Sequence, residues 1–203
     1  MELSIQCLTK HFGKKIAVDC VSAKLGPGVY GLLGANGAGK TTLMRMLCAI
    51  LEPTCGQVCL DGKDVAAMGE AYRDVLGYLP QSFGYYPTYT AAEFLAYIAA
   101  LKGIPRNAAG ARVRQMLELL DLTAVADKKL RTFSGGMKQR VGIAQALLND
   151  PQVLILTSLP RAWTPGNGCG CATCCRSTPG TGSCCCPPTS CPTWRPLRTR
   201  CSL

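Results

Sequence analysis

The 203-residue sequence contains no apolar run of the roughly 18–20 residues that a membrane-spanning helix requires. The longest candidate, residues 94–101, is too short. The first residues also lack the basic segment and apolar core of a secretory signal. These absences exclude a membrane-embedded chain and lead us to expect a cytosolic protein.

Acidic residues and lysine are missing from residues 157–203, which instead hold five arginines, nine of the 14 cysteines and seven of the 13 prolines. Half of the net charge of +10 therefore comes from this segment, so the charge does not indicate a nucleic-acid partner. We expect one domain over residues 1–156 and an aberrant tail over 157–203. The cysteines of the domain are scattered as buried thiols usually are: Cys7, Cys20, Cys48, Cys55 and Cys59.

A glycine-rich segment, Gly34 to Thr41, fits the pattern G-x-x-x-x-G-K-[ST] at every fixed position. An apolar run at 29–33 precedes it and a helix-compatible run at 41–50 follows it. This strand–loop–helix context is the one in which the pattern indicates a phosphate-binding loop rather than a glycine-rich turn.

The residue types in this loop suit a triphosphate. Gly34, Gly37 and Gly39 allow backbone conformations that turn successive N–H groups toward phosphate oxygens. The positive end of the following helix adds to that anion site. Lys40 can reach the β- and γ-phosphates, and the Thr41 hydroxyl can bind Mg²⁺.

The remaining pattern predicts an α/β fold. We expect strands over 2–8, 16–25, 56–61, 75–79 and 153–156, the last as a fully buried parallel strand. Helices are expected over 91–101, 109–120 and 137–148, and the first two resemble a helical insertion. Ser134 is placed to cap the third helix.

The order of motifs resembles the nucleotide-binding domain of ATP-binding cassette (ABC) transporters. The phosphate loop is followed by Gln81 after a strand and then by Ser-Gly-Gly-Met-Lys-Gln at 134–139, opening a helix. The similarity covers residues 1–156, with Phe133 a mild departure where the family usually has leucine. It implies a P-loop NTPase fold with a mixed-sheet core and a helical subdomain at about 82–135.

The resemblance also implies the binding residues for ATP and Mg²⁺. Phe12 would stack on adenine, although it could equally be a core residue at a strand end. Gln81 would touch Mg²⁺ together with Thr41, unless it is a solvated loop amide. The signature would face the nucleotide of a second domain, unless it is only a capped helix start. The implied ATP-binding residues are Phe12, Gly34, Ala35, Asn36, Gly37, Ala38, Gly39, Lys40, Thr41, Thr42, Gln81, Ser134, Gly135, Gly136 and Gln139.

After residue 156 the similarity stops. The family continues with Asp-Glu-Pro-Thr-Ala-Gly-Leu-Asp-Pro, whereas residues 157–165 read Thr-Ser-Leu-Pro-Arg-Ala-Trp-Thr-Pro. Plausible GC-rich codons for this stretch, read one base out of register, encode the family sequence. In the same frame residues 183–193 encode a strand-like run with a histidine at the position of Thr189. A frameshift explains both matches and the cysteine runs better than a metal or disulfide module does.

The frameshift predicts a truncated domain with a disordered tail. It leaves an exposed sheet edge with uncovered apolar surface at 153–156. No catalytic residue remains intact, since the glutamate is missing and the single histidine is His11. We therefore expect an ATPase by family whose own hydrolysis is severely impaired.

By resemblance, the function is that of an ATP-binding subunit of an exporter-like ABC transporter. Its partners would be a transmembrane permease subunit and a second nucleotide-binding domain, in a homo- or heterodimer, with no direct nucleic-acid binding. The expected location is the cytoplasmic face of the membrane. The alternative is a soluble ABC-type ATPase or binding-only regulator that acts on nucleic acid or the ribosome.

Overall fold

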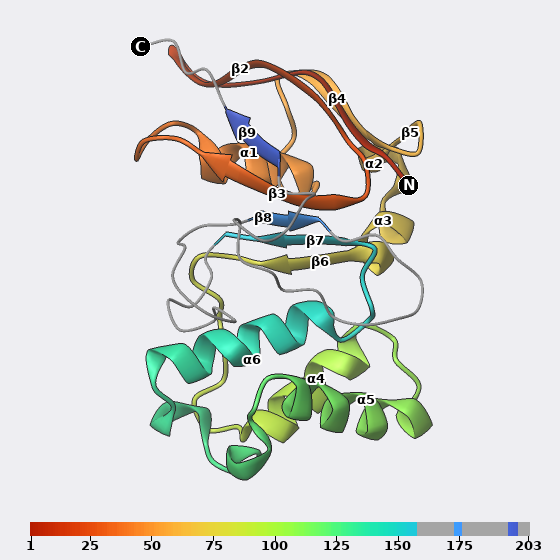
Figure 1. The fold of residues 1–203 in the computed structure, drawn as a ribbon, viewed down its shortest axis with the longest axis vertical. Coiled ribbons are helices and arrows are strands. Elements are labelled where there is room, and N and C mark those ends of the chain that lie inside the picture. Colours follow the sequence, from red (N-terminus) through yellow and green to blue (C-terminus); the bar gives the residue numbers. More distant parts are fainter. Residues whose placement is uncertain (158–172, 176–194, 199–203) are drawn as a thin grey trace.

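The structure is a computed structural model that describes residues 1–157, 173–175 and 195–198. A curved antiparallel sheet forms one side of the molecule, the parallel pair of strands β6 and β7 lies in the middle, and a group of helices forms the other side (Figure 1). The strands are β1 (Leu3–Phe12), β2 (Lys15–Leu25), β3 (Gly28–Leu33), β4 (Cys55–Leu60), β5 (Lys63–Asp64), β6 (Leu76–Leu79), β7 (Val153–Leu156), β8 (Thr173–Cys175) and β9 (Arg195–Arg198). The α-helices are α1 (Lys40–Leu47), α2 (Val65–Met68), α3 (Glu70–Val75), α4 (Ala91–Leu101), α5 (Arg106–Leu119) and α6 (Gly135–Leu147), with 3₁₀ turns at Thr123–Val125 and Leu130–Thr132.

The curved sheet has the strand order β2-β1-β4-β5. Its first hairpin turns at Gly13, whose φ of 59° lies in the left-handed region that glycine adopts without a steric penalty. Strand β1 extends to Phe12, four residues beyond the predicted strand end. The expected strands at 16–25 and 56–61 are confirmed as β2 and β4, to within one residue at each end.

The strand that precedes the glycine-rich loop, β3, pairs with two short strands from the C-terminal segment. It is antiparallel to β8 and parallel to β9. These two strands are exceptions to the predicted disorder of residues 157–203. The rest of that prediction concerns residues 158–172, 176–194 and 199–203, which lie outside the described part of the chain.

Strands β6 and β7 are parallel and separate two hydrophobic cores. Side chains alternate across a strand, so Val153 and Ile155 enter the core beneath the curved sheet, whereas Leu154 and Leu156 enter the core formed by α4, α5 and α6. The predicted buried parallel strand is thus confirmed. The prediction of uncovered apolar surface at this strand was wrong, because all four side chains are at most 7% exposed.

Helices α4 and α5 lie in the range where a helical insertion was expected, and α6 packs between them and the β6–β7 pair (Figure 1). Thr90 and Glu93 start α4 with a capping box, in which each side chain binds the other residue's backbone N–H. Two short helices, α2 and α3, were not predicted. No helix in the described residues is long and apolar enough to cross a membrane.

The cysteines differ from the prediction of scattered buried thiols. Cys48 and Cys59 are buried thiols outside any disulfide, as expected, but Cys55 is exposed. Cys7 and Cys20 are exposed and form a disulfide between β1 and β2. Their pairing could not be predicted from the residue pattern, because the strand irregularities that bring them together come from the register of the two strands.

Candidate nucleotide site

The glycine-rich loop lies between the end of β3 and the start of α1. Gly37 and Gly39 have φ values of 86° and 74°, as their proposed role requires, whereas Gly34 is not among the residues with positive φ. A turn closed by the Ala38 N–H and the Ala35 carbonyl, 3.2 Å apart, shapes the middle of the loop. The loop residues from Gly34 to Gly37 are exposed, so that a ligand can reach them.

The Gly39 backbone lies directly against strand β2. A β-carbon at this position would come within 2.1 Å of the Ala17 carbonyl oxygen and 3.2 Å of the Val18 side chain. No larger residue fits there without displacing the β2 backbone. The first sheet thus fixes the point at which the loop becomes a helix.

Helix α1 begins without any side chain as a cap and without an acidic residue in its first turn. The first N–H groups of a helix have no intrahelical partner, and the helix dipole places positive charge at the same end. The Thr41 side chain is exposed at this end and that of Thr42 is half-buried. An anion is the ligand that such a helix start accommodates.

Lys40 folds back over the loop. Its Nζ donates hydrogen bonds to the carbonyl oxygens of Gly34, at 2.8 Å, and Ala35, at 2.7 Å. The ammonium group is therefore held at the mouth of the loop, where a phosphate oxygen could replace either carbonyl as its partner. Asn36 lies in the exposed turn between these carbonyls and Gly37.

Phe12 stands at the end of β1 and is 51% exposed, with the Lys10 ammonium 5.5 Å from its ring centroid. The alternative that it is a core residue was wrong. Its hairpin includes β2, the strand that contacts Gly39. An adenine-stacking role for the exposed ring stays a prediction.

Gln81 is exposed in the loop that follows β6. Helix α6 packs closely against this segment, because a β-carbon on Gly142 would meet Leu79 at 2.7 Å and Phe83 at 3.0 Å. The loop containing Gln81 thus lies between the two residues that α6 contacts. No group of three or more His, Cys, Asp or Glu side chains in the described residues could hold a metal ion.

The signature segment forms a second helix start. The Ser134 hydroxyl accepts a hydrogen bond from the Met137 N–H at 3.3 Å, which confirms the predicted cap. Gly135 and Gly136 are exposed with open space where a β-carbon would lie, and Gln139 is half-buried one turn further on. The segment can therefore present backbone N–H groups to a second molecule.

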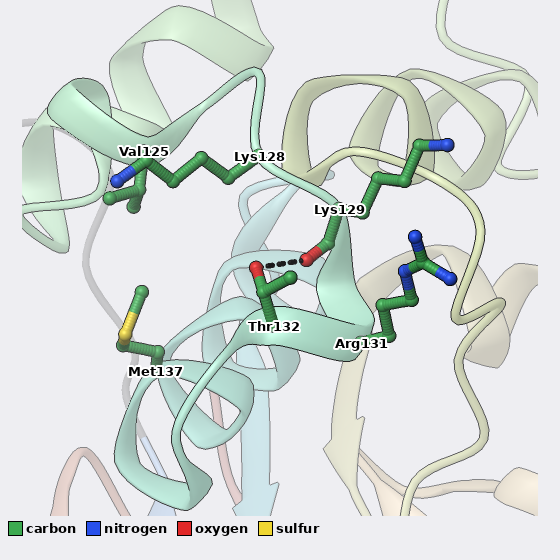
Figure 2. A pocket seen from close by; sticks show the side chains of 6 residues that line it. All are labelled: Val125, Lys128, Lys129, Arg131, Thr132 and Met137. Carbon is green, nitrogen blue, oxygen red and sulfur yellow. Dashed lines mark hydrogen bonds between the residues drawn. The ribbon is translucent and has the colours of Figure 1, made fainter.

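A pocket of about 620 Å³ adjoins the signature, and its cations were not assigned a role from the sequence. Lys128, Lys129 and Arg131 line it, with Val125, Thr132 and Met137. Figure 2 shows Lys128 extending toward Val125, whereas Lys129 and Arg131 extend to the opposite side. The cations do not converge on one point, so the geometry defines a basic surface rather than an anion site.

A strand, a glycine loop with an inward lysine and an uncapped helix define a P-loop NTPase. Comparison with known proteins identifies the family within this class. The profile of the family described as ABC transporter matches residues 18–157, and the chain belongs to this family.

Two curated relatives illustrate the match. The Nod factor export ATP-binding protein I of Burkholderia pseudomallei (strain 1710b) is 40% identical over 155 residues, which cover 76% of this chain and 51% of the relative. The uncharacterized ABC transporter ATP-binding protein YxlF of Bacillus subtilis (strain 168) is 40% identical over 164 residues, which cover 80% of this chain and 54% of the relative. The chain thus spans about half the length of the curated relatives it matches.

Solved structures of ABC transporter cassettes have the same fold as this chain. A dimeric bacterial ABC transporter cassette superposes with a TM-score of 0.68 at 26% identity, over 76% of this chain and 72% of that one. A post-hydrolysis state of that cassette, bound to ADP and Pi, gives a TM-score of 0.67 with the same identity and coverage. The predicted fold class is confirmed.

Proposed function

We propose that this chain is an ATP-binding subunit of an exporter-type ABC transporter that binds ATP but hydrolyses it poorly. The observation that carries the proposal is the arrangement at the start of α1. An uncapped helix N-terminus, two glycines with positive φ and the ammonium group of Lys40 come together in this one loop. These are the groups that bind a nucleotide's phosphates.

The poor hydrolysis follows from what stands after β7. In the family, an aspartate that steadies Mg²⁺ and a glutamate that polarises water come here, and this chain has Thr157 and Ser158. Magnesium in such sites is bound by one or two carboxylates together with substrate phosphates and water. Thr41 and Gln81 offer only neutral oxygens, so they fit the ion weakly. Removing one such electrostatic group typically costs about 10²–10³ in rate.

Partners and location are inferred from the relatives. Several are named as Nod factor export ATP-binding proteins, which supports the export direction. Dimeric cassettes among the structural neighbours support pairing with a second nucleotide-binding domain. A separate transmembrane permease would carry the substrate path, which places the chain at the cytoplasmic face of the membrane. We propose no direct nucleic-acid contact.

Binding of a fluorescent ATP analogue to the full chain tests the proposal. Lys40→Ala should weaken binding by about 10–100-fold, because hydrogen bonds to charged groups contribute about 1.5–3 kcal/mol. Lys14→Ala, in the exposed β1–β2 turn, is the matched control and should bind as the parent does. Equal affinities for the parent and Lys40→Ala would overturn the proposed site. Brisk steady-state hydrolysis of Mg-ATP would overturn the claim of poor turnover.

A further inference from the structure

The disulfide between Cys7 and Cys20 joins the two strands of the first hairpin at its exposed surface. Both residues have positive φ, 44° at Cys7 and 39° at Cys20, which is uncommon for residues other than glycine. Each lies where the β1–β2 register shifts. The chain therefore departs from regular strand geometry at the two positions that place these sulfurs together.

Side-chain hydrogen bonds hold that backbone in place independently of the disulfide. The Cys7 N–H donates to Ser22 Oγ at 2.8 Å, and the Cys20 N–H donates to Thr9 Oγ1 at 3.0 Å. The Thr9 hydroxyl in turn donates to the Cys7 carbonyl at 3.3 Å. Because Thr9 contacts both cysteines, the two thiols would remain neighbours after the bond opens, so the bond could close again.

A shallow surface depression of about 540 Å³ lies beside this disulfide. Cys7 itself lines it, so one sulfur-bearing residue borders a space large enough for a small molecule. The lining also includes one cation, Lys24, together with the polar side chains of Gln6 and Ser22. These groups suit a small thiol that carries carboxylates and amides.

Strand β2 links the disulfide to the phosphate loop. Ala17, three residues before Cys20, has its carbonyl oxygen in the space that a β-carbon on Gly39 would occupy, at 2.1 Å. That carbonyl is in direct contact with the loop backbone, so a displacement of β2 would displace the loop as well. A change in how firmly β2 is held at Cys20 is thus passed directly to the start of α1.

We propose that Cys7–Cys20 is a reversible thiol-exchange site for a small anionic thiol of the glutathione class, and that its opening weakens nucleotide binding. The thiolate attacks one sulfur, the Cys7–Cys20 bond breaks, and a mixed disulfide forms while the other cysteine leaves as a thiolate. A second thiol then releases the first as its disulfide and leaves both cysteines reduced. Closure runs the same steps in reverse with glutathione disulfide.

The effect of disulfide opening on nucleotide binding rests on the proposed nucleotide function, and its reversibility rests on the proposed cytoplasmic setting. Disulfides in that compartment are rare, and those that occur are usually transient or redox-sensing. An exposed pair beside a surface depression, three residues along β2 from the contact with the phosphate loop, has the accessibility that such a role needs.

Peptide mapping tests the exchange site without reference to nucleotide. Trypsin separates Cys7, in residues 1–10, from Cys20, in residues 16–24, and each peptide holds one cysteine. The chain treated with glutathione disulfide should yield these two peptides linked, and reduced glutathione should separate them. Absence of the linked pair, or Cys7 linked instead to the 46–63 peptide that contains Cys55, would overturn the site.

Charge selectivity tests whether the surface depression recognises an anionic thiol. Lys24→Gln should slow opening by reduced glutathione about twofold, in keeping with a weak surface charge interaction, and should not slow opening by cysteamine, which is cationic. Lys63→Gln, in β5, is the matched control and should leave both rates unchanged. Equal slowing of both thiols by Lys24→Gln would contradict recognition of an anionic thiol.

Nucleotide binding tests the coupling. The oxidised full chain should bind the fluorescent ATP analogue at least about fivefold more tightly than the reduced chain. The double variant Cys7→Ala, Cys20→Ala should match the reduced chain and show no redox dependence, which controls for the other twelve cysteines. Equal binding by both redox forms of the parent would overturn the coupling. Binding by neither form would instead overturn the nucleotide function and leave the exchange site to the peptide map.

Discussion

Thr157 donates two hydrogen bonds to the main-chain carbonyl of Leu79, one from its backbone N–H at 3.0 Å and one from its hydroxyl at 2.9 Å. The first continues the parallel ladder of β6 and β7 by one residue. The second turns the side chain toward the backbone two residues before Gln81. By the resemblance to the family, we infer that this hydroxyl stands where a carboxylate would steady Mg²⁺.

We predict that Mg²⁺ contributes little to nucleotide affinity in this chain and more in Thr157→Asp. A carboxylate adds a charged oxygen ligand where the parent has a neutral hydroxyl. Binding of the fluorescent ATP analogue, measured with Mg²⁺ and with EDTA, should differ less than about threefold for the parent and about tenfold for the variant. Thr157→Asn is the control, since it has the shape of aspartate without the charge. A gain as large in Thr157→Asn would show that shape, not charge, is responsible.

We predict that Gly39→Ala destabilises the fold by about 2–4 kcal/mol and abolishes tight nucleotide binding. The new β-carbon would meet the Ala17 carbonyl at 2.1 Å, and strand β2 would have to move. Gly13→Ala separates the backbone effect from the clash, because Gly13 also has positive φ but has nothing within 4 Å. That control should cost only about 1–2 kcal/mol. Urea unfolding measures both, and equal losses would contradict the clash.

The parts of the fold that were predicted correctly rest on local signals. The glycine loop needs a strand before it and a helix after it, and both are within three residues of their predicted ends. The buried strand at Val153–Leu156 follows from four consecutive apolar residues after a proline. The cap at Ser134 follows from a hydroxyl that precedes two glycines and a helical pattern.

The parts that were missed depend on contacts between distant segments. Cys7 and Cys20 pair because two strand irregularities coincide across a hairpin, and no residue type encodes that coincidence. The expected apolar surface at β7 is absent because two separate cores, one of them including α6, cover its two faces, and the apolar run alone does not reveal that cover. Helices α2 and α3, of four and six residues, are too short to display a helical period.

We predict that Ser134→Ala lowers stability by about 1 kcal/mol and Ser134→Gly by only a few tenths, as for other helix caps. The hydroxyl accepts from Met137 at 3.3 Å, without the reciprocal bond that Glu93 adds at the start of α4. Thr90→Ala, which removes half of that capping box, should therefore cost more than Ser134→Ala. Thermal unfolding of the three variants gives the order, and a larger loss at Ser134 would contradict the assignment of a simple cap.

We finally predict a pH dependence that originates at Lys102. Its Nζ donates to Asn149 Oδ1 at 2.7 Å, and the Asn149 amide donates to the Asp74 carbonyl, so that the end of α4 is tied through Asn149 to α3. Burial lowers the pKa of Lys102 below its usual 10.5, and the Asp74 carboxylate only partly offsets this.

The sign follows from proton uptake on unfolding. Between the lowered pKa and 10.5 the unfolded chain binds more protons at Lys102 than the folded chain, so the free energy of unfolding rises as the pH rises through this window. Below the window the cost of burying the charge is constant. Urea titrations of the parent and Lys102→Met should therefore diverge as the pH approaches 10.5, with the parent gaining stability relative to the variant. The free energy of unfolding of Lys128→Met, a variant at an exposed lysine, should change with pH as that of the parent does. The same pH dependence for Lys102→Met would mean that the Lys102 ammonium is not desolvated in the fold.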